Sequence, residues 1–492
     1  MLMRAEVSAA RRRIGRRGPD LTARPRPSEP AGADGLPQIE HIVILMMENH
    51  SYDNYLGLLG HGDGFELGRD GRPSAANPAG DGTLVGLRHL PTTAQVKYVP
   101  TQSWAASHIQ WNDGACDGFV RSIEQTIPGA DAGAGMGYWT EADLPFYAGL
   151  ARTFPLATRW FSSCLGPTFP NRRFMIAGTA HGLIDDLPFG MIDYPRRGTI
   201  FDLLTAHEIS WMNYHMVSPL RVGWRRLTHA RGMNFLRILG GVLGAVVPVL
   251  WPRIVAKIQF TADLYPLGLL RSLNHVRPMD SFWQAARSGT LPAVSFVDPD
   301  FKFCSEENPQ DVTAGEAFAA EVVNAVMAGP GWPGTLLIWL YDEHGGSYDH
   351  VPPPAAVAPD DVPGVSSLER FWLLRLLRST GIGRDIARAD AGPASYEQLG
   401  FRVPAVVVSP YARPGYVTDQ VYEHTAVLRL IGRKWNLPPL TRRDADAADL
   451  LETLDLAAPP AFLTPPRLPE PALRRRLHEQ GGFSPPTDSN SP

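Results

Sequence analysis

Acidic and amide side chains follow three apolar runs of this sequence. Glu48-Asn49-His50 follows the first run, Asp298-Pro299-Asp300 the second and Asp342-Glu343-His344 the third. Carboxylate and amide oxygens are hard ligands, which suit Ca²⁺, Mg²⁺ or Mn²⁺ better than Zn²⁺. Adjacent acids such as Asp342 and Glu343 repel each other when buried, so a cation or a shared proton is expected. The pattern favours one or more divalent ions, and the alternative is that the acids cap the helices that follow.

Thr168 is a candidate nucleophile because of its surroundings. Residues 166–182 read GPTFPNRRFMIAGTAHG, and Pro170 fits the first turn of a helix. Thr168 would then lie just before a helix N-terminus, where free N–H groups favour a phosphate. A hydroxyl beside a metal can attack phosphorus, and Asn171 and Arg172 could donate hydrogen bonds to phosphoryl oxygens. The alternative is an ordinary N-cap by Thr168, with Asn171 and Arg172 on the surface.

Histidines supply candidates for proton transfer, because an imidazole titrates near neutral pH. His108 lies in the turn-rich segment SHIQWNDGACDGF (107–119), and His344 and His350 flank Gly345-Gly346. A single histidine is more often structural, but one that lies beside a carboxylate pair at a strand end favours a functional role. The other candidates are His50, His181 and His424.

Four near-continuous apolar runs predict strands that are buried on both faces, as in a parallel sheet covered by helices. They are Ile42–Met47, Ala293–Val297, Leu336–Tyr341 and Val403–Val408. A helical pattern between them begins with a capping box, in which Thr313 is the cap and Glu316 the third residue of the helix. Strands that alternate with helices predict a doubly wound, mostly parallel α/β fold. Ligands bind outside the carboxyl ends of such strands, so the polar residues after the runs would meet in one crevice.

Composition excludes several classes of protein. The 492 residues, of which 44% are hydrophobic and 20% charged, fit one large α/β domain and exclude a disordered chain or a coiled coil. A net charge of −4 does not predict a nucleic-acid partner. Three cysteines without a CxxC motif exclude a disulfide framework and a cysteine zinc site.

The chain divides into a catalytic domain at 37–458 and two tails. Residues 1–36 are rich in Arg and Pro and predict a disordered basic tail, and residues 459–492 form a second, Pro-rich tail. No secretory signal is readable in the first tail, which favours the cytoplasm or a membrane surface. Residues 217–270 are basic and contain the most apolar window, 238–251, which is too short to span a bilayer. This insertion is interpreted as a cap subdomain or as a contact with an anionic membrane.

Six segments together resemble the bacterial phospholipase C and acid phosphatase phosphoesterases. They occur in the order found in that family and span about residues 38–450. The segments are MENHSYDNYLG (47–57), SHIQWNDGACDGF (107–119), GPTFPNRRF (166–174), YDEHGGSYDHVPPP (341–354), RVPAVVVSPYARPG (402–415) and HTAVLRLIGRKWNLPPLTRRDADAADL (424–450).

The resemblance implies an alkaline-phosphatase-like α/β fold and cleavage of phosphoesters through a covalent phospho-enzyme. Thr168 stands at the position of the nucleophile, and His108 would contact the phosphate or protonate the leaving group. Arg172 lies in the matching PNR motif, and His350 is a further catalytic candidate. The residues that would bind a divalent metal are Glu48, Asn49, Thr168, Asp342 and Glu343.

One segment departs from the family pattern. The family often has a histidine shortly before the helix that starts near residue 313, whereas this chain reads SEENPQD at 305–311, with Glu307 or Asn308 in its place. If that histidine assists leaving-group departure, its replacement predicts reduced activity or a changed substrate. Family members are also frequently exported.

The implied activity is that of a metal-dependent phosphoesterase of the phospholipase C type, which hydrolyses a phospholipid to diacylglycerol and a phosphorylated head group. The first alternative is an acid phosphatase that uses the same residues on soluble phosphomonoesters. The second alternative is a lipid- or phosphate-binding protein that has lost turnover.

Overall fold

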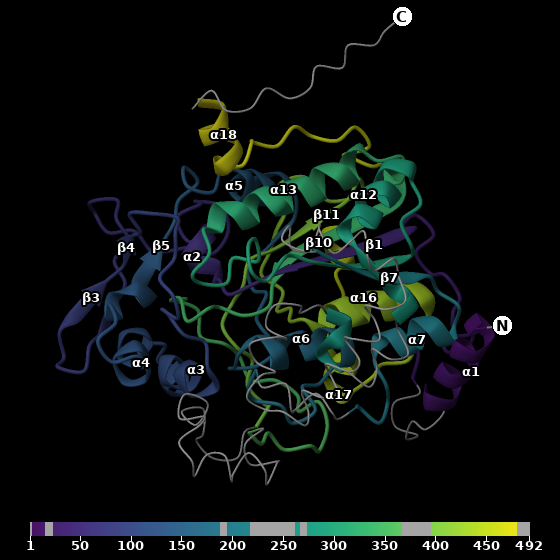
Figure 1. Ribbon diagram of the computed structural model, residues 1–492, viewed down its shortest axis with the longest axis horizontal. Helices are drawn as coiled ribbons and strands as arrows, with labels where there is room; N and C mark the ends of the chain where they lie inside the picture. Colours follow the sequence, from purple (N-terminus) through teal and green to yellow (C-terminus); the bar gives the residue numbers. More distant parts are fainter. Residues whose placement is uncertain are drawn as a thin grey trace, which may run out of the picture.

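The computed structural model describes residues 2–14, 23–186, 194–216, 261–265, 273–366 and 395–479. The insertion predicted at 217–270 lies outside the described residues except for 261–265, and so its role as a cap or membrane contact stays a prediction. No helix in the described ranges is long and apolar enough to cross a membrane. Figure 1 shows a central sheet with helices on both faces.

Five parallel strands form the larger part of an eight-stranded sheet. β1 (His41–Met47) lies between β10 (Thr335–Tyr341) and β9 (Val294–Asp298) and is parallel to both. β7 (Trp211–His215) pairs with the outer side of β9, and β8 (Val276–Pro278) pairs with β7. The carboxyl ends of these strands therefore reach the same edge of the sheet.

Three further strands complete the other side of the sheet. β11 (Ala405–Val408) runs antiparallel to β10, and the short strands β6 (Leu156–Ala157) and β12 (Val417–Thr418) follow it. The four predicted runs correspond to β1, β9, β10 and β11, and the α/β class with a mostly parallel sheet is confirmed. Because β11 is antiparallel, its carboxyl end lies at the opposite edge of the sheet, and the residues just before it share the edge with the ends of β1 and β10.

Helices cover the two faces of the sheet in separate layers (Figure 1). One layer contains α5 (Pro145–Thr153), α12 (Met279–Ser288) and α13 (Val312–Ala328). The other contains α6 (Thr168–Ala177), α7 (Ile200–Ala206), α16 (Thr425–Trp435) and α17 (Arg442–Asp446). Three more helices lie at the end of the sheet where β1 finishes: α2 (Tyr52–Leu56), α3 (Trp104–Trp111) and α4 (Phe119–Thr126).

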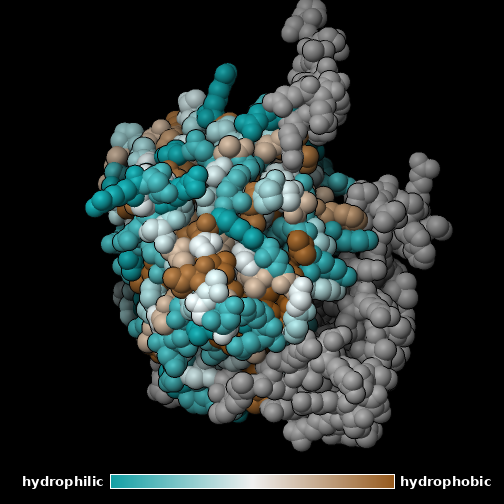
Figure 2. All heavy atoms as spheres, turned by 90° about the vertical axis from the view of Figure 1, so that its left-hand side faces the viewer, coloured by the Kyte–Doolittle hydropathy of each residue, from teal (hydrophilic) through white to brown (hydrophobic). Residues whose placement is uncertain are grey.

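The side of the molecule that carries α3, α4, β3 (Leu84–Gly86) and β4 (Arg88–His89) faces the viewer in Figure 2. Hydrophobic residues gather in the middle of this face, and hydrophilic residues surround them. In the described part of the whole chain, the exposed large hydrophobic side chains are Leu67, Leu84, Val96, Tyr98, Phe303, Val357, Val421 and Leu463.

Part of each predicted tail has regular structure. α1 (Leu2–Ile14) packs on α7, where Arg11 Nε donates to the carbonyl of Ala206 over 2.9 Å. Asp34 forms an ion pair with the buried Lys434 Nζ at 2.9 Å. α18 (Ala472–Glu479) contacts α13. These segments are therefore ordered by contacts with the rest of the protein, whereas the sequence predicts disorder. Their partners come from distant parts of the chain, and composition alone does not reveal such contacts.

The N-terminus of α13 differs from the predicted capping box. Asp311 is the N-cap, and its carboxylate accepts from the Thr313 N–H at 2.9 Å. Glu316 instead accepts from the N–H groups of Phe146 and Ala472, each at 2.8 Å. The buried Glu316 therefore caps the first turns of α5 and α18. The sequence pattern S/T-x-x-E does not distinguish this role from a capping box in its own helix.

Gly315 lies in the interior of α13, at a point where the helix approaches Glu306 closely. A methyl group at this position would overlap the Glu306 side chain. Three tyrosine hydroxyls hold the Glu306 carboxylate, those of Tyr55, Tyr147 and Tyr341, at 2.5 to 2.6 Å. The carboxylate therefore has little freedom to move aside.

We predict that Gly315→Ala destabilises the protein by about 1–3 kcal/mol, because the added methyl group overpacks a fixed neighbour. Alanine in place of glycine normally stabilises a helix interior by up to about 1 kcal/mol. The matched control is Gly432→Ala in α16, where the nearest atom to an added methyl is the Leu437 carbonyl oxygen at 3.4 Å. Urea unfolding of both variants measures the difference, and a stabilised Gly315→Ala protein would contradict the packing argument.

Candidate active site

The ends of β1 and β10 lie together at the edge of the sheet. The N–H of Asn49 donates to Asp342 Oδ1 at 3.2 Å. Asn49 has φ of 69°, a left-handed conformation that asparagine tolerates better than most residues. A side chain at Gly345 would overlap the Asn49 carbonyl, and its φ of +64° also favours glycine. The structure therefore places Glu48-Asn49 beside Asp342-Glu343, in the arrangement predicted from the sequence.

Arg172 extends from α6 to these strand ends and is fully buried. Its Nε donates to Asp342 Oδ2 at 2.8 Å, and its two terminal nitrogens lie 3.4 Å from Asp298 Oδ1 and 3.6 Å from Glu48 Oε1. The same guanidinium donates to the last two carbonyls of β1. In this structure Arg172 is thus the counter-ion of three strand-end acids, whereas the sequence predicts a donor to phosphoryl oxygens.

The acids around Arg172 outnumber this one cation. Burial raises the pKa of Glu48, Arg172 lowers it and the charge of Asp342 raises it further. Burial and Asp342 raise the pKa of Glu343 in the same way. Glu343 Oε1 and both polar atoms of the Asn49 amide are buried without a hydrogen-bond partner. Unpaired buried oxygens among excess negative charge are the environment that a hard cation fits.

Side chains of His, Cys, Asp and Glu alone do not form such a cation site. In the described residues, no three or more of them are grouped so that they could hold a metal ion. A cation at the strand ends would therefore also need neutral oxygen ligands, and the unpaired amide of Asn49 and the hydroxyl of Thr168 are of that kind.

Thr168 is the first residue of α6, whereas the sequence predicts that it lies just before the helix. The helix therefore begins one residue earlier than predicted. The residue before it, Pro167, makes no side-chain cap, and no hydrogen bond is found for the Thr168 hydroxyl among the described residues. The next N–H, that of Phe169, donates to Asp186 Oδ1 at 2.7 Å. Among the described residues, the helix therefore presents a hydroxyl without a hydrogen-bond partner at its N-terminus, next to a backbone N–H that already binds an anionic group.

Ser162 and Ser163 are the neighbouring hydroxyls, and both are fully buried. Ser163 Oγ donates to Glu423 Oε2 at 2.6 Å, and Ser162 Oγ lies 3.5 Å from the Cys164 carbonyl. Thr168 retains 7% of its surface, more than either serine.

Asn171 shapes the loop that precedes Thr168. Its Oδ1 accepts from the Cys164 N–H at 3.0 Å, and its Nδ2 donates to the carbonyls of Gly166 at 2.8 Å and Pro167 at 3.1 Å. Both ends of the amide are used within the loop. The structure therefore gives Asn171 a positioning role in place of the predicted contact with a phosphoryl oxygen.

His108 is partly buried on α3. It contacts Trp104, which in turn packs against the loop that precedes Thr168. The rings of His108 and Trp104 are 4.8 Å apart, and a Cβ at Gly166 would lie 2.8 Å from Trp104 Cε3. His108 Nδ1 donates to the Trp104 carbonyl at 2.8 Å, so Nε2 carries the lone pair of the neutral ring. Burial lowers the pKa of His108. An imidazole of this kind can accept a proton or, once protonated, donate one.

His350 belongs to a different network. Its Nδ1 lies 2.6 Å from Asp53 Oδ2, and Arg402 donates to both Asp53 and Asp349 at 2.8 to 2.9 Å. Burial lowers the pKa of His350, but the hydrogen bond and charge of Asp53 outweigh it, so the net pKa is raised. These contacts give His350 a place in a buried ion-pair network, and none of them reaches Thr168.

The remaining histidines are mostly held by structural hydrogen bonds. His344 Nε2 lies 2.7 Å from the side-chain oxygen of Gln110, and burial lowers its pKa to about 3. His424 donates to the Asp342 carbonyl at 2.6 Å and accepts from the indole of Trp160. His50 lies between Asn54 and the Glu306 carbonyl. The backbone N–H of His181 donates to the Thr179 hydroxyl.

Two acids at the site were not assigned from the sequence. Asp186 accepts a hydrogen bond from the Phe169 N–H, and its negative charge helps to raise the pKa values of Glu48 and Glu343. Glu307 is an exposed residue, and desolvation of its carboxyl, followed by the charge of Asp342, raises its pKa. Of the two residues that could replace the family histidine, Glu307 is the one on which the charges of Asp342 and Arg172 act, and Asn308 donates to the Pro100 carbonyl at 3.2 Å. The adjacent Asp185-Asp186 pair was the only sequence signal for the first of these acids.

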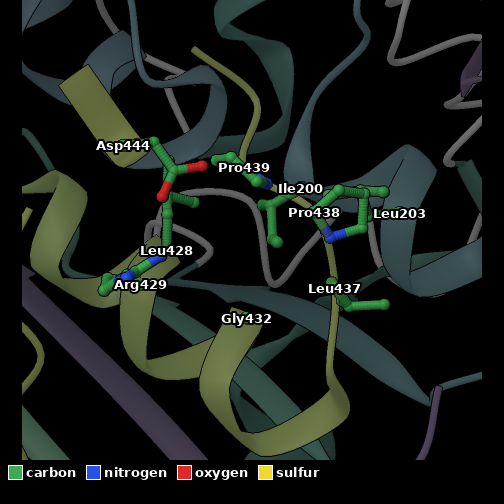
Figure 3. A pocket seen from close by; sticks show the side chains of 9 residues that line it. All are labelled: Ile200, Leu203, Leu428, Arg429, Gly432, Leu437, Pro438, Pro439 and Asp444. Atoms are coloured by element: carbon green, nitrogen blue, oxygen red, sulfur yellow. The ribbon is translucent and has the colours of Figure 1, made fainter. Parts of the chain in front are cut away.

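A pocket lies elsewhere, between α7, α16 and α17 (Figure 3). Its lining is mostly apolar and contains none of the predicted site residues: Ile200, Leu203, Leu428, Arg429, Gly432, Leu437, Pro438, Pro439 and Asp444. It adjoins the middle of α16, at Leu428, Arg429 and Gly432, whereas His424, which contacts Asp342, immediately precedes that helix. This pocket is therefore not part of the candidate site.

Residues 39–438 match the family model described as Phosphoesterase family. The chain belongs to this family. The phosphoesterase is 30% identical to phospholipase C B of Mycobacterium tuberculosis over 86% of its own length and 79% of the relative's. It is 28% identical to the hemolytic phospholipase C of Pseudomonas aeruginosa, over 85% and 56% of the two chains. It is 27% identical to non-specific phospholipase C6 of Arabidopsis thaliana, over 89% and 76%.

Family membership confirms the resemblance found in the sequence. The phosphoesterase is a hydrolase that acts on phosphoric ester bonds. The assignment of individual residues to catalysis or metal binding stays a prediction, and the geometry above indicates which residues to test first.

We predict that Arg172→Met destabilises the phosphoesterase by about 3–5 kcal/mol, because it leaves buried acids without their counter-ion. The pKa of Glu48 is already raised, so the folded state holds a proton more tightly than the unfolded chain does. Stability is then lost as the pH rises through the folded pKa, and removing the guanidinium increases that loss. The deficit of the variant should therefore be largest at high pH and shrink as the pH falls.

Urea unfolding between pH 5 and pH 8, with EDTA present, measures this dependence. The control is Arg433→Met, which removes a half-exposed ion pair with Asp449 and should cost about 1 kcal/mol or less. Equal losses in the two variants would show that Arg172 does not hold the strand ends together.

Proposed function

We propose that this phosphoesterase hydrolyses a phosphodiester bond of a phospholipid, with Thr168 as the nucleophile. The observation that carries the proposal is the position of Thr168, which begins α6 one helical turn before Arg172, the residue that contacts the acid-rich strand ends, and which keeps 7% of its surface exposed. Helix N-termini favour phosphate groups, and at this one the Phe169 N–H already donates to a carboxylate, that of Asp186. The names of the relatives, all phospholipases C, support a phospholipid as the substrate.

The donor set at the strand ends supports a bound divalent cation. Its ligands would be Glu48, Asn49, Asp342 and Glu343, together with the hydroxyl of Thr168. The unpaired oxygens of Asn49 and Glu343 fit such a cation, and oxygen ligands favour Ca²⁺, Mg²⁺ or Mn²⁺ over Zn²⁺. A cation bound there would favour the deprotonated hydroxyl and neutralise charge on the phosphoryl oxygens.

The residues of the chain then divide the reaction between them. Thr168 Oγ gives up its proton to water and forms a bond to phosphorus while the bond from phosphorus to the diacylglycerol oxygen breaks, and that oxygen takes a proton. His108, whose protonated Nε2 can donate, supplies this proton and afterwards accepts one from the water that hydrolyses the phosphothreonine. Thr168 Oγ regains a proton from water when the phosphothreonine is hydrolysed. Arg172 keeps α6 at the strand ends, and Asn171 holds the loop before Thr168.

We predict that the purified protein releases p-nitrophenol from p-nitrophenylphosphorylcholine, that EDTA abolishes this activity, and that Ca²⁺, Mg²⁺ or Mn²⁺ restores it. Absorbance of the released phenol measures the rate, and p-nitrophenyl phosphate is the comparison. Cleavage of the monoester alone would favour the acid phosphatase. Silence on both esters, with binding of phosphate, would favour a binding protein and direct attention to residues 305–311.

We predict that Thr168→Ala lowers kcat by roughly a thousandfold or more, as loss of a covalent nucleophile does, and leaves the far-UV spectrum unchanged. Thr168→Ser should retain part of the activity, since a hydroxyl remains. The matched control is Thr199→Ala, which removes the cap of α7 and should cost about 1 kcal/mol of stability with little effect on kcat. Near-normal turnover by Thr168→Ala would place the nucleophile elsewhere.

A further inference from the structure

Two surface turns adjoin one loop of the chain. Residues 92–99 pair with residues 305–312: the N–H of Gln95 donates to the Gln310 carbonyl at 3.2 Å, and the N–H of Val312 to the Thr93 carbonyl at 3.0 Å. Residues 301–304 lead directly into the same loop, and Gln310 Nε2 donates to the Phe301 carbonyl at 3.2 Å. The turns 92–99 and 301–304 are therefore both anchored to the loop 305–312.

Both turns expose apolar side chains to solvent. Val96 and Tyr98 are each 65% exposed, and Phe303 is 43% exposed. In the described part of the chain, Tyr98 and Phe303 are the aromatic members of the set of exposed large hydrophobic residues. Single exposed apolar residues are common, but three on two turns that are anchored to the same loop, two of them aromatic, mark a candidate interaction surface.

A lysine accompanies each aromatic ring. Lys97 Nζ lies 4.6 Å from the centre of the Tyr98 ring, and Lys302 Nζ lies 5.0 Å from the centre of the Phe303 ring. Neither turn contains an acidic residue, although the whole chain carries a net charge of −4. The turns therefore combine aromatic rings with positive charge, a combination that favours the interface of an anionic lipid bilayer.

The loop between the turns leads to the candidate active site. The Ser305 carbonyl accepts from the N–H of Glu48 at 3.1 Å, and Glu307 lies close enough to Asp342 and Arg172 for their charges to act on it. The turn 92–99 also follows β4 in the chain, and β4 lies on the side of the molecule that faces the viewer in Figure 2. A surface bound by both turns would thus lie next to the loop that borders the strand ends.

We propose that the turns 92–99 and 301–304 dock onto the surface of an anionic phospholipid bilayer. Tyr98, Phe303 and Val96 enter the boundary between head groups and acyl chains, and Lys97 and Lys302 contact lipid phosphates. This inference rests on the proposed function, because docking would serve to bring the site of Thr168 to lipid head groups. It differs from the membrane contact predicted for residues 217–270, since it uses other residues.

Vesicle sedimentation tests the docking surface. The protein carries Thr168→Ala throughout, so that vesicle lipid is not consumed, and the vesicles contain phosphatidylcholine with or without phosphatidylserine. Tyr98→Ala with Phe303→Ala should lower the fraction bound by about tenfold or more on the mixed vesicles. Lys97→Gln with Lys302→Gln should lower binding on the mixed vesicles by roughly tenfold, and should have little effect on phosphatidylcholine alone.

The control is Leu84→Ala with Leu463→Ala, which removes exposed apolar side chains outside the two turns and should leave binding unchanged. Binding of the aromatic variant at the level of its parent would overturn the proposal, as would an equal loss in the control or a parent protein that binds no vesicles.

Hydrolysis of p-nitrophenylphosphorylcholine, with Thr168 intact, separates this proposal from the proposed function. This ester is soluble, so the aromatic and lysine variants should cleave it at the wild-type rate while they lose vesicle binding. If no ester is cleaved but vesicle binding depends on the turns, the docking surface stands and the proposed function fails. If the ester is cleaved but vesicle binding ignores the turns, the docking surface is wrong and the function stands.

Discussion

The buried guanidinium of Arg172 is the interaction on which the arrangement of the site depends. Acids at the ends of three neighbouring strands repel one another in a region of low dielectric. Arg172 contacts Glu48, Asp298 and Asp342 at once, and it does so from α6, the helix that begins with Thr168. One positive charge therefore keeps the strand ends close and sets the distance between them and the hydroxyl. Hydrogen bonding at the site is still incomplete, because Glu343 Oε1 and the Asn49 amide are buried without a partner.

A second buried acid organises the layer behind the site. Glu306 accepts from Tyr55, Tyr147 and Tyr341, which come from α2, α5 and the end of β10. It is the residue just before Glu307, so the three hydroxyls fix the loop that borders the strand ends. Burial raises the pKa of Glu306 to about 8, which shows how strongly its surroundings oppose a charge there. A few buried polar groups, each bonded to several helices and strands, thus fix how these elements lie relative to one another around the site.

Much of the fold follows from local pattern. The runs that form β1, β9, β10 and β11 are continuously apolar because these strands are covered on both faces, and the residues that follow the parallel ones meet by topology alone. Partner choice is harder to predict. Nothing local distinguishes an arginine that binds phosphate from one that neutralises strand ends, as Arg172 does, or shows that Glu316 caps distant helices. Likewise, the hydrogen bond of Asp186 to Phe169 forms only once the chain has folded.

Glu316 also gives the folding of this chain a particular form of cooperativity. Its two carboxylate oxygens separately hold the first turns of α5 and α18, elements that are more than three hundred residues apart in the sequence. If α18 detaches, one oxygen of a buried carboxylate loses its donor, and the cost of that unsatisfied group falls on the layer that contains α5 and Tyr147. The C-terminal helix is therefore thermodynamically coupled to the tyrosine cluster behind the candidate site, although it contributes no residue to it.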